Sequence, residues 1–420
     1  MADTAKKGKQ INYDYHGMML PADMIKDVME HVHTSNLVTE TSKSGKKVSI
    51  CIWGKHGIGK TSIPEQIAKE KGIGFKSIAP AQFEEMGDLL GMPGTGAWVN
   101  LKNESGEVIK SKLVDKDLVG SYLNNGWERD MHKANQMIVS PPQFVPNVDL
   151  GDPEEGFFVI DDFNRAGKRI INGIMQLLQD GGLDSWTLPP KWSIILTANP
   201  GGGNYSITEL DDAQLTRMFH MSMEFEAKLW AKWALNHDID ERVVNFVLAN
   251  PETIKTGELT TPRSIEYFAN TIRIFSDLKE NLGMVNIMGE GVLDKITATQ
   301  FATFINNDLV KLVTPEELLN AEDFPAFIKR KVITPFATGS NLRVDILNVI
   351  TTRLLYYCTD ELNGKLSKKQ MNNMKAFLKT SGIPNDLRLD MGLEIMATDK
   401  IQLHGIMADI EIGKLLLNRM

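Results

Sequence analysis

Cysteine is nearly absent from this chain: Cys51 and Cys358 are the only two among 420 residues. Two cysteines cannot build a disulfide framework or a structural zinc site, and their scarcity suits a reducing cytoplasm. Long hydrophobic runs are missing as well. Apolar runs such as residues 157–160 fall far short of the ~20 residues that a membrane-spanning helix needs. The first ten residues, MADTAKKGKQ, lack the apolar core of an export signal, so we expect a cytoplasmic protein that does not contact a membrane.

Positive charge is also in short supply. The chain has 46 Lys and Arg residues against 54 Asp and Glu residues, which gives a net charge of −8. Proteins that bind nucleic acid carry a basic excess or at least a basic stripe. Lys43, Lys46 and Lys47 form only a short basic run, which we interpret as a solvated linker. Nucleic acid is therefore an unfavoured partner.

The rest of the composition is that of an ordinary globular protein. Apolar residues make up 42% of the chain and charged residues 24%, which excludes a disordered or fibrous protein. A length of 420 residues, at ~150 residues per domain, indicates two to three domains.

Short apolar runs alternate with helical patterns between residues 48 and 199. Buried-strand patterns cover residues 48–53, 157–160 and 192–197, and helical spacing covers residues 63–71 and 171–178. This alternation predicts an α/β fold with a parallel sheet and helices on both of its faces. Polar residues follow the carboxyl ends of the strands, where such sheets bind ligands.

Other parts of the chain give different patterns. Residues 92–146 interrupt the alternation with Gly- and Pro-rich pieces, and their secondary structure is ambiguous. Helical spacing dominates from residue 224 onward, where residues 265–278 predict a helix with Tyr267, Ile274 and Leu278 on one face. The same spacing recurs at Leu347, Ile350, Leu354 and Tyr357.

The strongest motif is GKHGIGKT at residues 54–61, which matches the phosphate-binding loop pattern G-x-x-x-x-G-K-[ST]. Its glycines let successive backbone N–H groups curl around phosphate oxygens. Lys60 brings a positive charge to the β- and γ-phosphates, and the Thr61 hydroxyl ligates Mg²⁺. The loop lies between a predicted strand and a predicted helix, as the pattern requires, so we expect ATP and Mg²⁺ as cofactors. The residues expected to contact the nucleotide are Gly54, His56, Gly57, Ile58, Gly59, Lys60, Thr61 and Ser62.

Two carboxylates follow the apolar run 157–160. Asp161 is placed like a carboxylate that leaves a buried strand to hold the Mg²⁺ shell, so it is a candidate metal ligand with Thr61. Asp162 is the candidate catalytic carboxylate that polarises the attacking water. The alternative for Asp162 is that it only caps the following helix.

Three further polar residues are candidate catalytic groups, together with Lys60. Asn199 ends the third strand and could orient the water, although an Asn before Pro is also common in turns. Arg217 could reach the γ-phosphate of a neighbouring subunit as an arginine finger. Arg263 opens a predicted helix. For both arginines the alternative is an exposed surface residue.

The order of these motifs resembles the AAA+ ATPases and, more narrowly, their MoxR-like, dynein-related branch. The resemblance covers roughly residues 23–279 and includes DDFNRA at 161–166, TANP at 197–200, Arg217, and Pro262-Arg263. It also includes DLLGMP at 88–93 and LPPKW at 188–192. Most members have Glu where this chain has Asp162, which is the one departure at a catalytic position.

The resemblance implies an organisation for the chain. An N-terminal helical segment and linker (1–45) would precede the AAA+ α/β core (46–223), a helical lid (224–285) with Arg263 as sensor 2, and a helical C-terminal domain (286–420). Residues 92–146 would form an insert and residues 183–190 a hairpin, both facing the ring pore or a partner.

The resemblance also implies an activity. ATP would be hydrolysed at the subunit interfaces of a ring, expected to be a hexamer, with Arg217 supplied by the next protomer. The ring would remodel or assemble a protein client, with a von Willebrand factor A-domain protein as an expected partner.

Two other functions stay open at this point. One is a DNA-associated motor or clamp-loader-like ATPase, which the acidic balance disfavours. The other is a weakly hydrolysing ring scaffold, in which Asp162 in place of Glu has slowed catalysis.

Overall fold

The structure is a computed structural model, and it describes residues 13–202, 206–256, 259–306, 312–337, 339 and 342–417. Residues 1–12 of the expected N-terminal segment lie outside the described residues. The chain divides into two compact units, Met1–Glu224 and Phe225–Met420.

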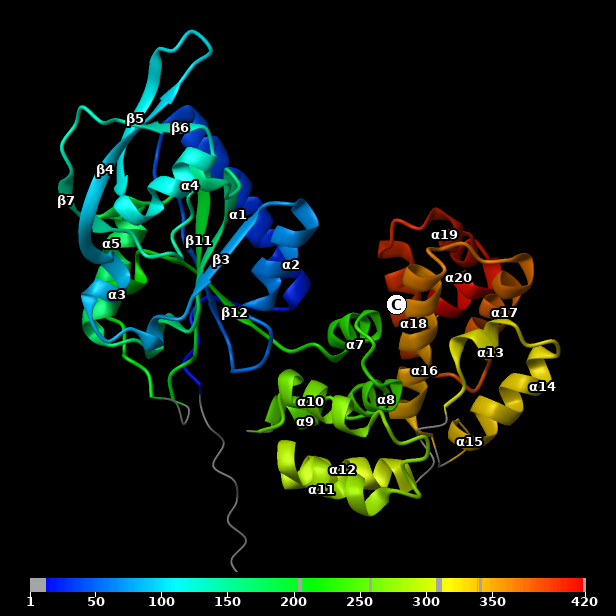
Figure 1. The fold of residues 1–420 in the computed structure, drawn as a ribbon. Coiled ribbons are helices and arrows are strands. Elements are labelled where there is room, and N and C mark those ends of the chain that lie inside the picture. The colour runs from blue at the N-terminus through cyan, green and yellow to red at the C-terminus, as the bar shows by residue number, and fades with distance from the viewer. Residues whose placement is uncertain are drawn as a thin grey trace, which may run out of the picture. The chain divides into compact units, whose positions relative to one another are not determined.

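A six-stranded parallel sheet forms the centre of the first unit (Figure 1). The strands predicted at 157–160 and 192–197 are buried, as expected for a parallel sheet covered on both faces. The strand predicted at 48–53 is shorter than expected: it covers Ile50–Trp53, and Val48 is exposed. The strand that ends at the phosphate loop, β2, lies between the strand that leads to Asn199 and the strand that follows Arg217. In spatial order the strands are β1 (Met18–Leu20), β12 (Phe219–Met223), β2 (Ile50–Trp53), β11 (Lys191–Ala198), β8 (Glu155–Ile160) and β3 (Gly74–Ile78).

Helices cover both faces of this sheet, as the alternation predicts. Ile50 and Ile52 of β2 belong to one core cluster with α1 (Ala22–Ser42) and α2 (Ser62–Lys71). Cys51 and Trp53 point to the other face, because successive side chains of a strand alternate. That face packs on α5 (Lys168–Asp180) and α3 (Met86–Leu90). The predicted α/β fold, a parallel sheet with helices on both faces, is confirmed.

The best-defined of these helices is α5, which begins three residues before the predicted range and ends two residues after it. Ile170, Ile174 and Leu177 are buried on one face, and each stabilises the fold by about 1.5–3 kcal/mol. The helix stops at Gly181, whose φ of 69° lies in the left-handed region that glycine adopts without strain.

The ambiguous segment 92–146 forms a small antiparallel sheet with a core of its own, shown in cyan in Figure 1. Its long strand β4 (Met92–Lys102) pairs with β5 (Val108–Asp115) along one edge. The other edge of β4 pairs with β6 (Trp127–Arg129) and β7 (Gln136–Ser140). The short helix α4 (Val119–Asn124) packs against this sheet. A separate hairpin pairs β9 (Gly182–Leu183) with β10 (Trp186–Thr187), so it begins one residue before the segment 183–190 that was expected to form one.

The second unit is built of helices. Their bounds are α7 (Ala227–Asn236), α8 (Glu241–Ala249), α9 (Glu252–Thr256), α10 (Pro262–Ile272), α11 (Leu282–Val292), α12 (Lys295–Asn306), α13 (Pro315–Leu319), α14 (Phe324–Ile328), α15 (Thr334–Phe336), α16 (Val344–Tyr356), α17 (Lys368–Lys379), α18 (Asn385–Ala397), α19 (Ile401–Met407) and α20 (Ile410–Leu417). The apolar repeat at Leu347, Ile350 and Leu354 is buried in α16, as its spacing predicts. No helix among the described residues has the length and apolarity needed to span a bilayer.

The predicted helix 265–278 is wrong in its second half. The helix α10 ends at Ile272, and Tyr267 and Ile274 are exposed instead of sharing a buried face with Leu278. The reason lies in another helix: the Arg242 guanidinium donates to the carbonyl oxygen of Phe275 at 2.7 Å and to that of Ile272 at 3.4 Å. This side chain satisfies carbonyls at the helix end, so the chain turns there.

Candidate functional site

The phosphate loop is a tight turn between β2 and α2. Gly57 has a φ of 69° and Gly59 a φ of 107°, so both adopt left-handed backbone that disfavours larger residues. The backbone N–H of Ser62, the first residue of α2, donates to the carbonyl oxygen of Gly59 at 3.1 Å. His56 and Ser62 are exposed at the loop surface, whereas Ile58 packs against the core.

Lys60 lies almost fully inside the loop, with a side chain that is 6% exposed. Its Nζ donates to the carbonyl oxygens of Gly54 at 2.9 Å and Lys55 at 3.1 Å. It also donates to Oδ1 of Asn199 at 3.2 Å, and Oδ1 of Asp162 lies 3.8 Å away. Residues from three neighbouring strand ends therefore meet at one ammonium group.

Asp161 accepts hydrogen bonds from two threonine hydroxyl groups at the carboxyl ends of the same strands. Its Oδ1 accepts from Thr61 Oγ1 at 2.5 Å and from Thr197 Oγ1 at 2.7 Å. The Thr197 oxygen in turn accepts from the backbone N–H of Asp162 at 2.8 Å. A carboxylate beside a threonine hydroxyl is a set of hard oxygen donors, so the chemistry of these residues fits Mg²⁺.

Asp162 has an unusual backbone. Its φ of 48° lies in the left-handed region, where Asp and Asn are found far more often than other non-glycine residues. The side chain is 27% exposed, with Nη1 of Arg165 3.7 Å from Oδ2. The turn that begins at Phe163 receives no capping hydrogen bond from this side chain, so the structure does not support the capping interpretation.

Asn164 is a further residue of this site to which the sequence pattern assigned no role. It is 1% exposed and holds the backbone of Asn199 from both sides. Its Nδ2 donates to the carbonyl oxygen of Asn199 at 2.8 Å, and its Oδ1 accepts from the backbone N–H of Asn199 at 3.1 Å. The only signal for this residue in the sequence is an amide side chain three residues after Asp161.

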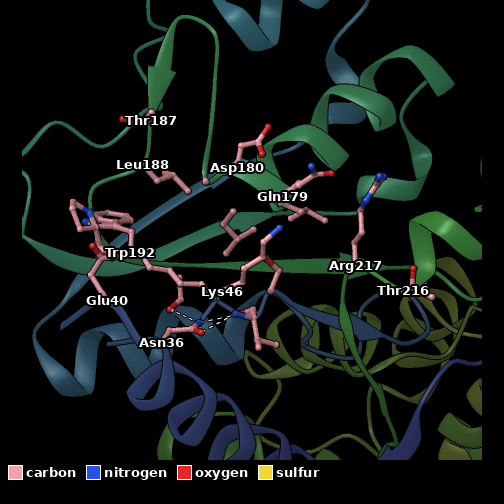
Figure 2. Close-up of a pocket in the computed structure, with 18 residues that line it drawn as sticks. Asn36, Glu40, Lys46, Gln179, Asp180, Thr187, Leu188, Trp192, Thr216 and Arg217 are labelled. Carbon is pink, nitrogen blue, oxygen red and sulfur yellow. Dashed lines mark hydrogen bonds and ion pairs between the residues drawn. The ribbon is translucent and has the colours of Figure 1, made fainter. Parts of the chain in front are cut away.

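Arg217 lies at the amino ends of the central strands, opposite to the carboxyl ends where the phosphate loop lies. It precedes β12, whose first residue, Phe219, pairs with Ile50 at the start of β2. The phosphate loop follows the other end of β2, roughly 13 Å away at ~3.3 Å per residue. Arg217 lines a hollow of about 780 Å³ together with Lys46 and residues at the end of α5 (Figure 2). The structure therefore does not bring Arg217 to the loop of its own chain.

Arg263 belongs to the second unit and lies in the first turn of α10, with its side chain exposed. The helix begins with Pro262 after Thr261, whose Oγ1 accepts from the backbone N–H of Ser264 at 3.2 Å. Ser264 Oγ accepts from the backbone N–H of Thr261 at 2.8 Å, which completes a capping box. The helix start predicted from Pro262 is thus well fixed.

Comparison with known proteins gives limited similarity. No protein-family model matches the chain. The Lon protease of Campylobacter jejuni is 27% identical over 151 residues, which is 34% of this chain and 18% of that protein. Two solved point mutants of RuvB from Thermotoga maritima align over 83% of this chain, with 12% and 11% identity and TM-scores of 0.33 and 0.32, and cover 95% and 87% of those chains.

Proposed function

We propose that this chain is a Mg²⁺-dependent ATPase of the AAA+ type. The observation that carries the proposal is the meeting of Lys60, Thr61, Asp161, Asp162 and Asn199 around one phosphate loop. Lys60 is placed to donate to phosphate oxygens in exchange for its bonds to loop carbonyls. Thr61 and Asp161 would hold Mg²⁺, which supplies neutralising charge at the phosphates.

In this proposal Asp162 and Asn199 act on the water. Asp162 accepts a proton from the attacking water, while the Asn199 amide orients that water or the γ-phosphate. The mutual contacts of Lys60 with both side chains support this assignment, because they place a base, an amide and a cation within one small volume. Arg263 is proposed to contact the nucleotide from the lid, as the motif order implies.

We infer further that the site is shared between protomers of a ring. Arg217 lies at the edge of the sheet remote from its own loop, so a phosphate-contacting role requires a neighbouring chain. A head-to-tail contact of this kind repeats around a closed ring. A hexamer is the proposed state.

The resemblance to MoxR-like proteins supports a more specific role. In this role the chain forms a cytoplasmic ring that remodels or assembles a protein client, and the ring works with a von Willebrand factor A-domain protein as its partner. The lid at 224–285 and the C-terminal domain at 286–420 are part of the same proposal. The insert sheet β4–β7 is proposed as the surface that faces the pore or the partner.

Steady-state phosphate release by the purified chain tests the activity. We expect release that requires both ATP and Mg²⁺ and that stops when EDTA removes the metal. ATP binding with no release would favour the ring scaffold instead. A rise in release on adding DNA, together with increased DNA fluorescence anisotropy, would favour the DNA-associated motor.

Asp162→Asn should retain ATP binding but lower turnover about 100-fold or more, because the amide keeps the shape without acting as a base. Asn also tolerates the left-handed backbone of this position. Asp162→Glu should lower turnover as well, because the backbone there favours the shorter side chain. Phosphate release and ATP calorimetry measure both effects, with Asp27→Asn on the exposed face of α1 as a control. Equal turnover in Asp162→Asn would leave Asp162 with no catalytic part.

Asn164→Ala should lower both stability and turnover. It leaves the backbone N–H and carbonyl of buried Asn199 without their partner, which costs about 1–3 kcal/mol of unfolding free energy. Asn164→Asp keeps the acceptor but sets a buried carboxylate oxygen against the Asn199 carbonyl oxygen, so we expect a loss of stability at least as large as that of Asn164→Ala. Denaturant unfolding and phosphate release measure the two effects. Unchanged turnover in a destabilised Asn164→Ala chain would show that Asn164 only supports the fold.

A further inference from the structure

His220 links the last residue before the phosphate loop to the turn that contains Arg217. On one side, Nε1 of Trp53 lies 2.9 Å from Nδ1 of His220, and Trp53 is the last residue before the loop. On the other side, Nε2 of His220 lies 2.8 Å from the carbonyl oxygen of Leu215. Trp53 lies at the carboxyl end of β2, whereas Leu215 lies before the amino end of β12. His220 is paired with Cys51, and Trp53 follows Cys51 by two residues, so the side chains of His220 and Trp53 project from the same face of the sheet.

The two contacts fix the protonation of the ring. An indole N–H only donates, so Nδ1 of His220 accepts and carries no proton. A carbonyl oxygen only accepts, so Nε2 carries the proton and donates to Leu215. The ring of His16 lies 4.4 Å from the Trp53 ring and 5.7 Å from that of His220. Burial, and then the proximity of His220, lower the pKa of His16, which favours the neutral form of the His16 ring beside Trp53.

The carbonyl oxygen of Leu215 closes the turn that contains Arg217. It ends the short helix α6 (Asp212–Leu215) and also accepts from the backbone N–H of Met218 at 3.3 Å. The backbone N–H of Arg217 itself donates to the carbonyl oxygen of Gln214 at 3.3 Å. Arg217 therefore lies inside a turn whose closing carbonyl is also held by His220.

We propose that His220 is a positioning residue that fixes Arg217 for the neighbouring protomer by bridging Trp53 and Leu215. The inference rests on the proposed shared site, and it assigns His220 a part that the motif order does not contain. The direction of the effect is specific. Changing His220 should lower phosphate release when the change is in the protomer that supplies Arg217. The same change should have little effect on phosphate release in the protomer that supplies the phosphate loop.

Mixed rings separate these two protomers. A Lys60→Ala chain keeps Arg217 but lacks a working loop, and an Arg217→Ala chain keeps the loop but lacks the arginine. Activity of the mixture arises at interfaces where the intact loop meets the intact arginine. His220→Phe, which keeps a ring but loses both hydrogen bonds, is then added to one partner at a time.

We expect His220→Phe in the Lys60→Ala partner to lower the restored phosphate release about tenfold through kcat, with an unchanged KM for ATP. In the Arg217→Ala partner the same change should leave phosphate release within about twofold of the value for the mixture with unchanged His220. His220→Gln, which carries both an acceptor and a donor, should recover most of the loss. Trp53→Phe in the arginine-supplying partner breaks the bridge at its other end, so it should cause a similar loss that does not add to that of His220→Phe.

Each outcome decides the proposal. Equal losses in either partner would make His220 a general structural residue and overturn the inference, as would no loss in either. If His220→Phe does not fold, as judged by its thermal unfolding, Trp53→Phe provides the same comparison. Absence of any restored activity before His220 is changed would overturn the shared site itself and, with it, the role of His220.

Discussion

A chain carrying Lys60→Ala should lose measurable ATP binding. The Lys60 ammonium is the one cation that the loop holds inside itself, bonded to the carbonyl oxygens of Gly54 and Lys55 and to Asn199. A hydrogen bond to a charged group contributes about 1.5–3 kcal/mol, so the loss of two phosphate contacts weakens binding roughly 100-fold or more. Calorimetry with Mg²⁺ and ATP measures this directly.

The control for this experiment lies in the same loop. Lys55→Ala removes a cation five residues earlier, at a position where the motif accepts any residue, so we expect a much smaller change in ATP affinity. Thermal unfolding of both variants without nucleotide shows whether the loop is still formed. Unchanged ATP affinity of a folded Lys60→Ala chain would refute the assignment of residues 54–61 as the phosphate loop.

The sequence was informative where a function depends on local spacing. The loop glycines, Lys60 and Thr61 lie within eight residues, and the left-handed φ of Gly57 and Gly59 is the conformation for which glycine is required. The strands that lead to Asp161 and Asn199 could be predicted because both faces of a parallel strand are buried, which leaves an unbroken apolar run. Their carboxyl ends then lie at one edge of the sheet, as the structure confirms.

The parts that could not be predicted depend on contacts between distant residues. The end of α10 is set by Arg242, 30 residues before Ile272, and no feature of residues 265–278 reveals it. The clamp of Asn164 on Asn199 and the bridge from Trp53 to His220 join residues 35 and 167 positions apart. The segment 92–146 was ambiguous because its strands bury only one small core and carry Gly and Pro, which weakens the alternating pattern.

Arg217→Ala should bind ATP normally and hydrolyse it poorly. The arginine lies at the edge of the sheet remote from its own loop, so its removal leaves the contacts of Lys60 and Thr61 intact. An arginine finger supplied in trans contributes ~10³–10⁵ in rate, by stabilising the charge that develops on the transferred phosphoryl group. Phosphate release should fall by a factor in that range while the ATP affinity from calorimetry stays the same. Arg330→Ala, at an exposed arginine of the second unit, should retain the parent rate.

The same arrangement makes the activity depend on assembly. A lone protomer has a phosphate loop without the Arg217 of a neighbouring chain, so phosphate release per chain should rise with protein concentration as rings form. Sedimentation at the same protein concentrations should show that the fraction of chains in rings rises together with phosphate release per chain. Arg217→Ala and Lys60→Ala should each be inactive, yet their mixture should regain part of the parent rate, because some interfaces pair an intact loop with an intact arginine. If specific activity were independent of concentration and Arg217→Ala were as active as the parent, each chain would hydrolyse ATP alone, and Arg217 would be an ordinary surface residue of the hollow in Figure 2.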